Sequence, residues 1–316
     1  MKLKAIRHRC VAALDRLLGF PRERRRFYRK LGYRLCLARP RSYNEKIVWR
    51  KLYDRNPLFP VVTDKWLVRG FACRQLGQDR AEKYLIPVHA VLESAHQLDA
   101  AMLDRPCVVK PTHASGDVLL LPRGLDRDIH EVRAIADEWL RKPPYRLRHH
   151  EWAYRQLKPR LIVEQYLVGD DGGPAADYKF VVINGSTRMV QVHRCRFSGH
   201  RRSVFTRDWR HIEVDGDNIA GGPQPRPENY EEMLALAEEL ASPFDFMRVD
   251  MYNLDGRIYL GELTCYPASG KRPFDPVDFD FELGSHWQLP ARRLGSRLLP
   301  HHRLPVWVQR IIPEAA

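Results

Sequence analysis

The sequence predicts an α+β protein with antiparallel sheets. Two segments, residues 177–194 and 246–264, alternate between apolar and polar residues on both sides of a tight-turn signal. The signals are Asn-Gly at 184–185 and Asp-Gly at 255–256, which are typical of β-hairpins. Predicted helices do not alternate strictly with the strands, as they would in a doubly wound parallel sheet. This order of elements therefore favours antiparallel sheets.

The composition is that of an ordered protein with a basic N-terminus. The 316 residues are 44% hydrophobic and 29% charged, which predicts two or three lobes with substantial cores. The formal net charge is +14, and residues 1–34 hold 12 Lys and Arg against Asp15 and Glu23, so +10 of it lies there. Such charge predicts anionic partners, but the mildly basic remainder argues against nucleic acid.

Cysteine spacing and hydropathy indicate the compartment. The six cysteines include no CxxC pair, so neither a zinc site nor a redox dithiol is indicated. There is no secretory signal, and no run approaches the roughly 20 apolar residues of a membrane span. We therefore expect a reduced, cytoplasmic protein.

Residues 1–35 predict basic, partly amphipathic helices. Val11, Leu14, Leu17 and Leu18 share one face at helical spacing. This face would pack on the body of the protein or lie flat on the anionic inner face of a membrane, and the sequence leaves both interpretations open.

Two helices and a short strand are predicted next. Ser42 precedes Glu45 by three residues, the spacing of a capping box, and starts a helix within residues 39–54. Residues 62–77 indicate a second helix, and a strand region broken by Pro87 follows.

Strands and helices mix in the rest of the chain. Segments 107–110 and 117–124 are predicted to form a hairpin around a loop of small residues. The spacing of apolar residues predicts helices at 129–142 and 229–241, and residues 160–167 are typical of a strand.

The hairpin at 246–264 carries two carboxylates. Glu262 and Thr264 are two residues apart in one strand, so they face the same side of the sheet, and Asp250 lies on the neighbouring strand. Apolar neighbours predict a half-buried sheet, where paired carboxylates need a cation to offset their repulsion. Two carboxylates and a hydroxyl are oxygen ligands that suit Mg²⁺. On an exposed sheet they would simply be solvated.

Whether Asp250 joins Glu262 depends on the turn. A two-residue loop would put Glu262 on the opposite face. A three-residue loop, residues 254–256, pairs Asp250 with Leu260 and leaves Glu262 one diagonal step away on the same face. We predict the three-residue loop because Gly256 supplies the left-handed residue that it needs.

Lys110 ends a predicted strand and faces the small residues of loop 113–116. Backbone N–H groups reach phosphate oxygens where side chains are small, so this arrangement indicates a phosphate contact. Neither GxxxxGK[ST] nor GxGxxG occurs, so the nucleotide would be held differently. Glu164 ends another strand, where a carboxylate beside exposed backbone could bind an adenine amino group. Each residue taken alone is also typical of an ordinary surface position.

The order of these motifs resembles the ATP-grasp superfamily, in particular its TupA-like branch, named for teichuronopeptide biosynthesis. The resemblance covers roughly residues 40–285, in the pieces RSYNEK, TDKWLVRGF, KYLIPV, VVKPTHASGD, VEQYL, DYKFVVING and MRVDMYNLDGRIYLGELTCYPASG. It implies an ATP-grasp fold, two α+β lobes that clamp a nucleotide, with a helical N-terminal portion. The implied division is a basic helical region at 1–60, an ATP-grasp N-terminal portion at 61–105, a lid lobe at 106–164, a core catalytic lobe at 165–290 and a tail at 291–316.

The resemblance also implies ATP and Mg²⁺ as cofactors and three groups of site residues. These are, for the nucleotide, Lys65, Lys110, His113, Ser115, Gly116, Lys179 and the adenine-hinge residues Glu164, Gln165, Tyr166 and Leu167; for the metal, Asp250, Glu262 and Thr264; and for catalysis, Arg248 and Lys179. Two features depart from the superfamily pattern. Thr264 stands where Asn is usual, and no N-terminal parallel-sheet domain is evident, since residues 1–60 are predicted to be helical.

The implied reaction joins a carboxylate to an amine. ATP phosphorylates the carboxylate, and the amine displaces phosphate from the acyl-phosphate, while magnesium and lysines neutralise the migrating phosphoryl group. We expect an amide on a cell-surface polysaccharide or its precursor. A kinase or a glycosyltransferase-pathway enzyme of polysaccharide biosynthesis is the alternative, and a non-catalytic basic binding protein is a third interpretation.

Residues 192–211 are the candidate site for an anionic sugar or glycan. Aromatic residues that can stack on sugars alternate there with arginines that can grip carboxylates: Arg194, Arg196, Arg201, Arg202, Arg207 and Arg210. A solvated basic loop is the alternative interpretation.

Overall fold

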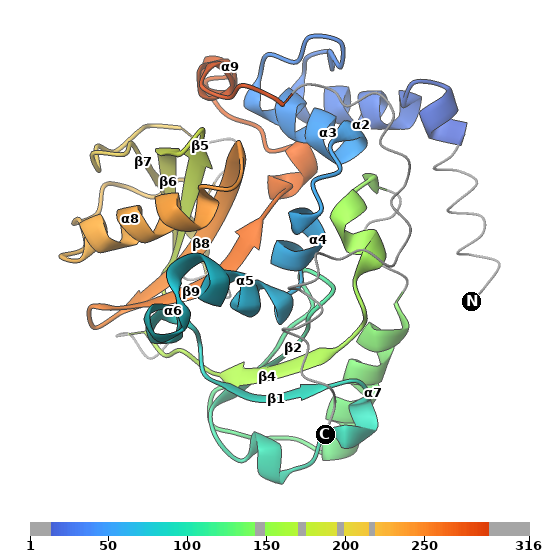
Figure 1. Cartoon of the computed structure of the whole chain (residues 1–316), viewed down its shortest axis with the longest axis vertical. Coiled ribbons are helices and arrows are strands. Elements are labelled where there is room, and N and C mark those ends of the chain that lie inside the picture. The colour runs from blue at the N-terminus through green and yellow to red at the C-terminus, as the bar shows by residue number, and fades with distance from the viewer. Residues whose placement is uncertain (1–13, 143–148, 170–174, 195–198, 215–218, 291–316) are drawn as a thin grey trace.

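The computed structural model describes residues 14–142, 149–169, 175–194, 199–214 and 219–290. It confirms the α+β prediction, with two antiparallel sheets that each have their own apolar core (Figure 1). The predicted tail at 291–316 lies outside the described residues, as does Arg196.

The smaller lobe is a four-stranded sheet in the order β1-β4-β2-β3. Its elements are β1 (Val88–Leu92), β2 (Cys107–Pro111), β3 (Leu119–Leu121), β4 (Leu161–Gln165) and helix α7 (Ile129–Arg141). Alternate residues such as Cys107, Val109 and Val163 share a core with α7, because successive strand residues point to opposite faces. The predicted hairpin of β2 and β3 is confirmed. Strand β1 belongs to this sheet although it precedes residue 106, the expected start of the lobe.

The larger lobe is a five-stranded sheet in the order β7-β6-β5-β8-β9. Its elements are β5 (Asp177–Ile183), β6 (Ser186–Arg194), β7 (Arg201–Phe205), helix α8 (Tyr230–Ala241), β8 (Phe246–Leu254) and β9 (Arg257–Thr264). Ile183 pairs with Ser186, so the two-residue Asn-Gly turn is confirmed. On β5, Phe180 stacks on Tyr230 of α8, which leaves alternate residues such as Lys179 for the opposite face.

Helices connect and brace the two sheets. They are α2 (Pro21–Leu31), α3 (Tyr43–Tyr53), α4 (Leu58–Thr63), α5 (Leu67–Leu76), α6 (Gln78–Tyr84) and α9 (Asp278–Ser285). The predicted capping box is confirmed, since the Ser42 hydroxyl accepts from Glu45 N and the Glu45 carboxylate accepts from Ser42 N. Gly284 lets α9 lie directly on this helix start, because a Cβ there would be 2.2 Å from the carbonyl oxygen of Arg41.

The predicted apolar face at the N-terminus does not pack on the described body. Leu14, Leu17 and Leu18 are exposed, and Val11 lies outside the described residues. Contact with a membrane surface stays a prediction. No helix in the described ranges is long and apolar enough to cross a bilayer.

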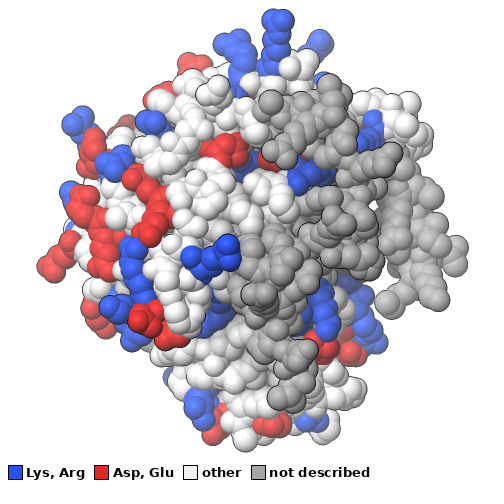
Figure 2. Space-filling model, in the orientation of Figure 1, with Lys and Arg blue, Asp and Glu red and all other residues white. Residues whose placement is uncertain are grey.

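Surface charge is unevenly spread. Figure 2 shows Asp and Glu gathered around α8, whereas Lys and Arg stand out along the edge near α2 and α3. Helix α2, with the sequence PRERRRFYRKL, therefore gives the helical region a cationic surface.

Candidate active site

A cavity of about 580 Å³ lies between the two sheets. It is lined by nearly all of the predicted nucleotide, metal and catalytic residues: Lys65, Lys110, Ser115, Gly116, Glu164, Gln165, Tyr166, Leu167, Lys179, Arg248, Asp250, Glu262 and Thr264. These residues are distant in the sequence, and both sheets contribute to them. The fold therefore gathers the predicted site in one place.

Buried charges form the floor of the cavity on the larger sheet. Arg248 lies between both carboxylates: its Nε and Nη2 are each 2.7 Å from an oxygen of Asp250, and Nη2 is 2.9 Å from Glu262 Oε1. The Thr264 hydroxyl donates to the same Glu262 oxygen at 2.8 Å. Lys179 donates to Asp250 as well. The predicted carboxylates and cations thus neutralise one another.

The turn that brings Asp250 and Glu262 together differs from the prediction. Leu254 pairs with Arg257, so the loop has two residues, and the predicted three-residue loop is wrong. A β-bulge restores the shared face: Met251 pairs with Leu260 and Asp250 with Glu262, which leaves the residue between Leu260 and Glu262 as the extra one.

Gly261 is the bulged residue, and its backbone lies close to the opposite strand. A Cβ at this position would be 3.1 Å from the Tyr252 ring and 3.2 Å from the carbonyl oxygen of Asp250. Glycine permits this close approach without displacing either neighbour. The bulge, rather than the turn, therefore sets the geometry of the acidic floor.

The electrostatics differ between the two carboxyl groups. Burial raises the pKa of Asp250 to about 6, although Arg248 and Lys179 oppose this. Burial would also raise the pKa of Glu262, but Arg248, Lys179 and Lys65 outweigh it and hold that pKa well below its usual range. The Glu262 side chain remains 42% exposed because it faces the cavity. This carboxylate is therefore charged and reachable by a cation.

A metal bound at this floor would have two carboxylates and one hydroxyl of the protein as ligands. Within the described ranges, no three His, Cys, Asp or Glu side chains are grouped to hold a metal by themselves. The oxygens of Asp250, Glu262 and Thr264 still fit Mg²⁺, because this ion keeps several water ligands and needs few protein carboxylates.

The smaller sheet supplies the opposite wall. Lys110 on β2 forms an ion pair with Glu164 on β4, and both face the cavity. The Lys65 ammonium donates to the carbonyl of Ala114, and burial lowers its pKa. Lys65 is thereby fixed against the loop that the sequence predicts to cover phosphates.

The predicted adenine hinge also lines the cavity. The N–H of Gln165 donates to the Pro87 carbonyl at 2.9 Å, and that of Tyr166 donates to Pro106 at 3.2 Å. These two backbone donors are therefore engaged within the protein. An adenine would have to use other backbone atoms of residues 165–167.

His113 does not lie where the sequence places it. Its side chain is buried, it is absent from the cavity lining, and burial lowers its pKa. Neither ring nitrogen has a hydrogen-bond partner within the described part of the chain. His113 is therefore buried away from the cavity lining, and its contact with a nucleotide stays a prediction.

The predicted glycan-binding arginines that the structure describes do not line the cavity. Arg194 and Arg201 pair across β6 and β7 and are exposed, whereas Arg202 is buried. None of these three lines the cavity. The arginines of segment 192–211 that the structure describes therefore do not face the cavity, and their contact with a glycan stays a prediction.

Several polar lining residues were not predicted, among them Asp177, Gln191, His193 and His200. Asp177 accepts from Lys179 at 2.6 Å, and its spacing of two residues from Lys179 in a strand was a usable signal. His193 and His200 stack with 2.8 Å between His193 Nδ1 and His200 Nε2. No local pattern marks His200, which the fold brings to the cavity from outside the strands.

Several solved ligases are similar in structure at low identity. The D-alanine–D-alanine ligase of Bacillus anthracis, complexed with ATP, has a TM-score of 0.43 at 15% identity, covering 71% of this chain and 63% of that one. The corresponding Helicobacter pylori ligase has 0.40 at 12%, with coverages of 73% and 60%. The L-amino acid ligase of Bacillus licheniformis has 0.37 at 15%, with 66% and 44%. The chain spans less than two thirds of each of these proteins.

The family comparison covers most of the sequence. No curated protein matches the chain. Residues 45–288 match the family described as TupA-like ATP-grasp, and this range contains both sheets and every residue that lines the cavity. The chain belongs to the TupA-like ATP-grasp family.

Proposed function

We propose that the protein is an ATP-dependent ligase that joins a carboxylate to an amine through an acyl-phosphate. One observation carries the proposal: a single cavity between two lobes contains three lysines, two arginines and an acidic floor. Positive side chains can position a triphosphate, and carboxylates can hold its metal, which are the requirements of phosphoryl transfer.

The roles follow from position. Lys110 and Lys65 on the smaller-lobe side would bind phosphate oxygens, and residues 164–167 would hold the adenine. Mg²⁺ bound by Asp250 and Glu262 would supply neutralisation of the phosphate charge. Arg248, which contacts both carboxylates, would lie beside the bound metal and could bind the transferring phosphoryl group.

The cavity also fits a reaction without a protein nucleophile. No cysteine is among its described lining residues, and of its two aliphatic hydroxyls Thr264 donates to Glu262 while Ser115 belongs to the predicted phosphate loop. Transfer of phosphate directly from ATP to the substrate carboxylate, followed by attack of an amine, requires only positioning and charge neutralisation.

We further propose that the carboxylate belongs to an anionic sugar of a cell-surface polysaccharide or its precursor, and that the reaction takes place in the cytoplasm. The concentration of positive charge on the helical region supports an anionic substrate.

Trapping of the acyl-phosphate tests the reaction class. The full chain would be incubated with Mg²⁺, ATP and pairs of uronic acids and amino acids, with hydroxylamine present in parallel. The expected result is release of ADP and phosphate that depends on the carboxylate, with a hydroxamate in place of the amide. ADP with a phosphorylated product and no free phosphate would identify a kinase instead. Protection against thermal unfolding by a UDP-sugar, but not by Mg-ATP, would indicate glycosyl transfer.

A further inference from the structure

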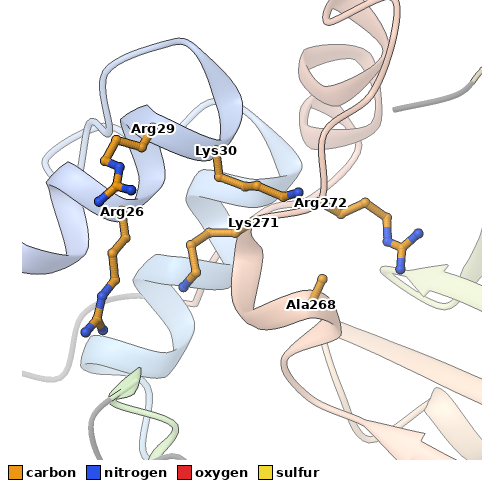
Figure 3. Close-up of a pocket in the computed structure, with 6 residues that line it drawn as sticks. All are labelled: Arg26, Arg29, Lys30, Ala268, Lys271 and Arg272. Atoms are coloured by element: carbon orange, nitrogen blue, oxygen red, sulfur yellow. The ribbon is translucent and has the colours of Figure 1, made fainter. Parts of the chain in front are cut away.

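A second hollow, of about 540 Å³, lies between α2 and the turn η5 (Pro267–Gly270) and is almost entirely cationic. Its lining is Arg26, Arg29, Lys30, Ala268, Lys271 and Arg272, which we call the basic pocket (Figure 3). None of these lining residues is acidic. Five cations from two separate elements thus line one space.

Helix stabilisation explains only part of this cluster. Arg29 and Lys30 lie in the last turn of α2, where cations interact favourably with the helix dipole. Lys271 and Arg272, however, come from the segment after η5 and are unrelated to that helix end. Arg29 and Lys30 are exposed and have no ion-pair partner among the described side chains. The helix dipole therefore does not explain why cations of both elements line the same pocket.

The carboxylate nearest this cluster is already engaged. Glu23 is fully buried beneath it and accepts from Lys51 at 2.6 Å and from Lys271 at 2.8 Å. One carboxylate between two lysines leaves no charge on Glu23 to balance Arg29 and Lys30. A bound anion would complete the charge balance.

The basic pocket adjoins the proposed ATP cavity. Ala268 and Arg272 line both spaces, and Figure 3 shows Arg272 extending away from α2. The dividing turn is held in an unusual conformation: Ala268 and Ser269 have φ of 46° and 57°, in the left-handed region that non-glycine residues rarely adopt.

Buried contacts from the helical region fix this turn. The Lys51 ammonium donates to the Ser269 carbonyl at 2.9 Å and lies 3.0 Å from its hydroxyl. Gly270 approaches α3 so closely that a Cβ would be 2.8 Å from the Asn44 carbonyl. The helical region therefore sets the boundary between the two spaces. Because Ala268 and Arg272 line both spaces, a long substrate could extend from one into the other.

We propose that the basic pocket binds the anionic acceptor of the ligase, a substrate with clustered negative charge beyond the carboxylate that reacts. This inference rests on the proposed function, because it assigns one end of the acceptor to the ATP cavity. The ligand chemistry is a pair or row of oxyanions, supplied by the carboxylates of a uronic-acid chain or by the diphosphate of an activated sugar. Guanidinium and ammonium groups bind both.

Binding to the full chain saturated with Mg²⁺ and AMP-PNP tests the assignment, because the nucleotide then occupies the phosphate-binding side chains of the ATP cavity. Calorimetry would measure the Kd of trigalacturonate in one arm and of inorganic pyrophosphate in the other. Arg29→Gln/Lys30→Gln removes two pocket charges from exposed positions. Arg22→Gln/Arg25→Gln removes two exposed charges from the same helix outside the pocket.

We expect one of the two probes to bind, the pocket variant to weaken it about tenfold or more, and the control variant to change it less than about twofold, since contacts to charged groups are among the stronger polar interactions. The probe that binds shows whether carboxylates or a diphosphate supply the oxyanions of the acceptor. Binding of neither probe, or equal losses in both variants, would overturn the assignment while leaving the ligase proposal intact. Failure of AMP-PNP itself to bind would contradict the ligase function, and the acceptor role with it.

Discussion

Glu23 on α2 forms ion pairs with two other segments of the protein, and removing its charge should lower the free energy of unfolding. Its Oε1 lies 2.6 Å from Lys51 Nζ on α3 and 2.8 Å from Lys271 Nζ after η5, and it is fully buried. Burial by itself would raise the pKa of Glu23, but the two lysines outweigh it and lower the pKa from 4.5 to about 2. That difference corresponds to about 3 kcal/mol of folding free energy at neutral pH.

The pH dependence has a definite sign. Because the pKa of Glu23 is lower in the folded state, its stabilisation is present above pH 4.5 and is lost as the pH falls towards 2. Urea unfolding of Glu23→Gln should show a loss of about 3 kcal/mol at pH 7 and a flatter decline in stability between pH 4.5 and 2. Burial lowers the pKa of Lys51 to about 7, so this lysine can release its proton and limit the loss.

An exposed glutamate provides the control. Glu138 is 74% exposed and lies 3.8 Å from Lys142, so Glu138→Gln should change the unfolding free energy very little. A loss below about 1 kcal/mol in Glu23→Gln, or an unchanged acid decline, would show that this buried carboxylate does not hold the helical region to the larger lobe.

Three further predictions concern the cavity and the packing. Lys110→Ala should weaken AMP-PNP binding in calorimetry by roughly tenfold or more, because a charged contact to phosphate is lost. The exposed control Lys158→Ala should not weaken it. Equal Kd values in the two variants would contradict a phosphate contact by Lys110. Asp250→Asn should remove most of the gain in AMP-PNP affinity that Mg²⁺ provides, and an undiminished gain would exclude this ligand. Gly284→Ala should lower the urea-unfolding free energy by about 3 kcal/mol because its Cβ would be 2.2 Å from a backbone oxygen, whereas Gly222→Ala, with no atom within 4 Å, should be nearly neutral.

Local signals in the sequence predicted the elements well. The capping box at Ser42, the two-residue turn after Ile183 and helix α7 depend on residues within a few positions of one another. Each of these structures is determined within its own segment, by a local hydrogen bond or by the backbone preference of a residue. The family motifs extended this to the cavity, because they specify which strand ends meet.

The register of β8 and β9 was harder to predict. Turn composition suggested a three-residue loop, yet the loop has two residues and Gly261 forms a bulge. A glycine within a strand is a recognised signal for a bulge, and it would have given the correct register. The shared face of Asp250 and Glu262 was predicted correctly, but for the wrong structural reason.

Contacts between distant segments could not be derived from local patterns. Arg26 and Lys271 are far apart in the sequence, and only the packing of α2 against η5 brings them to one pocket. The arginines at 194–202 looked equally suitable for an acceptor, but the sheet places Arg194 and Arg201 away from the cavity. Charge composition therefore predicted an anionic substrate without locating where it binds.

A crystal structure with Mg²⁺ and AMP-PNP is the most direct test of the central claim that the cavity between the sheets is an ATP site. We expect the adenine beside residues 165–167, the phosphates between Lys110 and Ser115, and the metal against Asp250 and Glu262. A nucleotide bound elsewhere, or phosphates that do not approach Asp250 and Glu262, would contradict it.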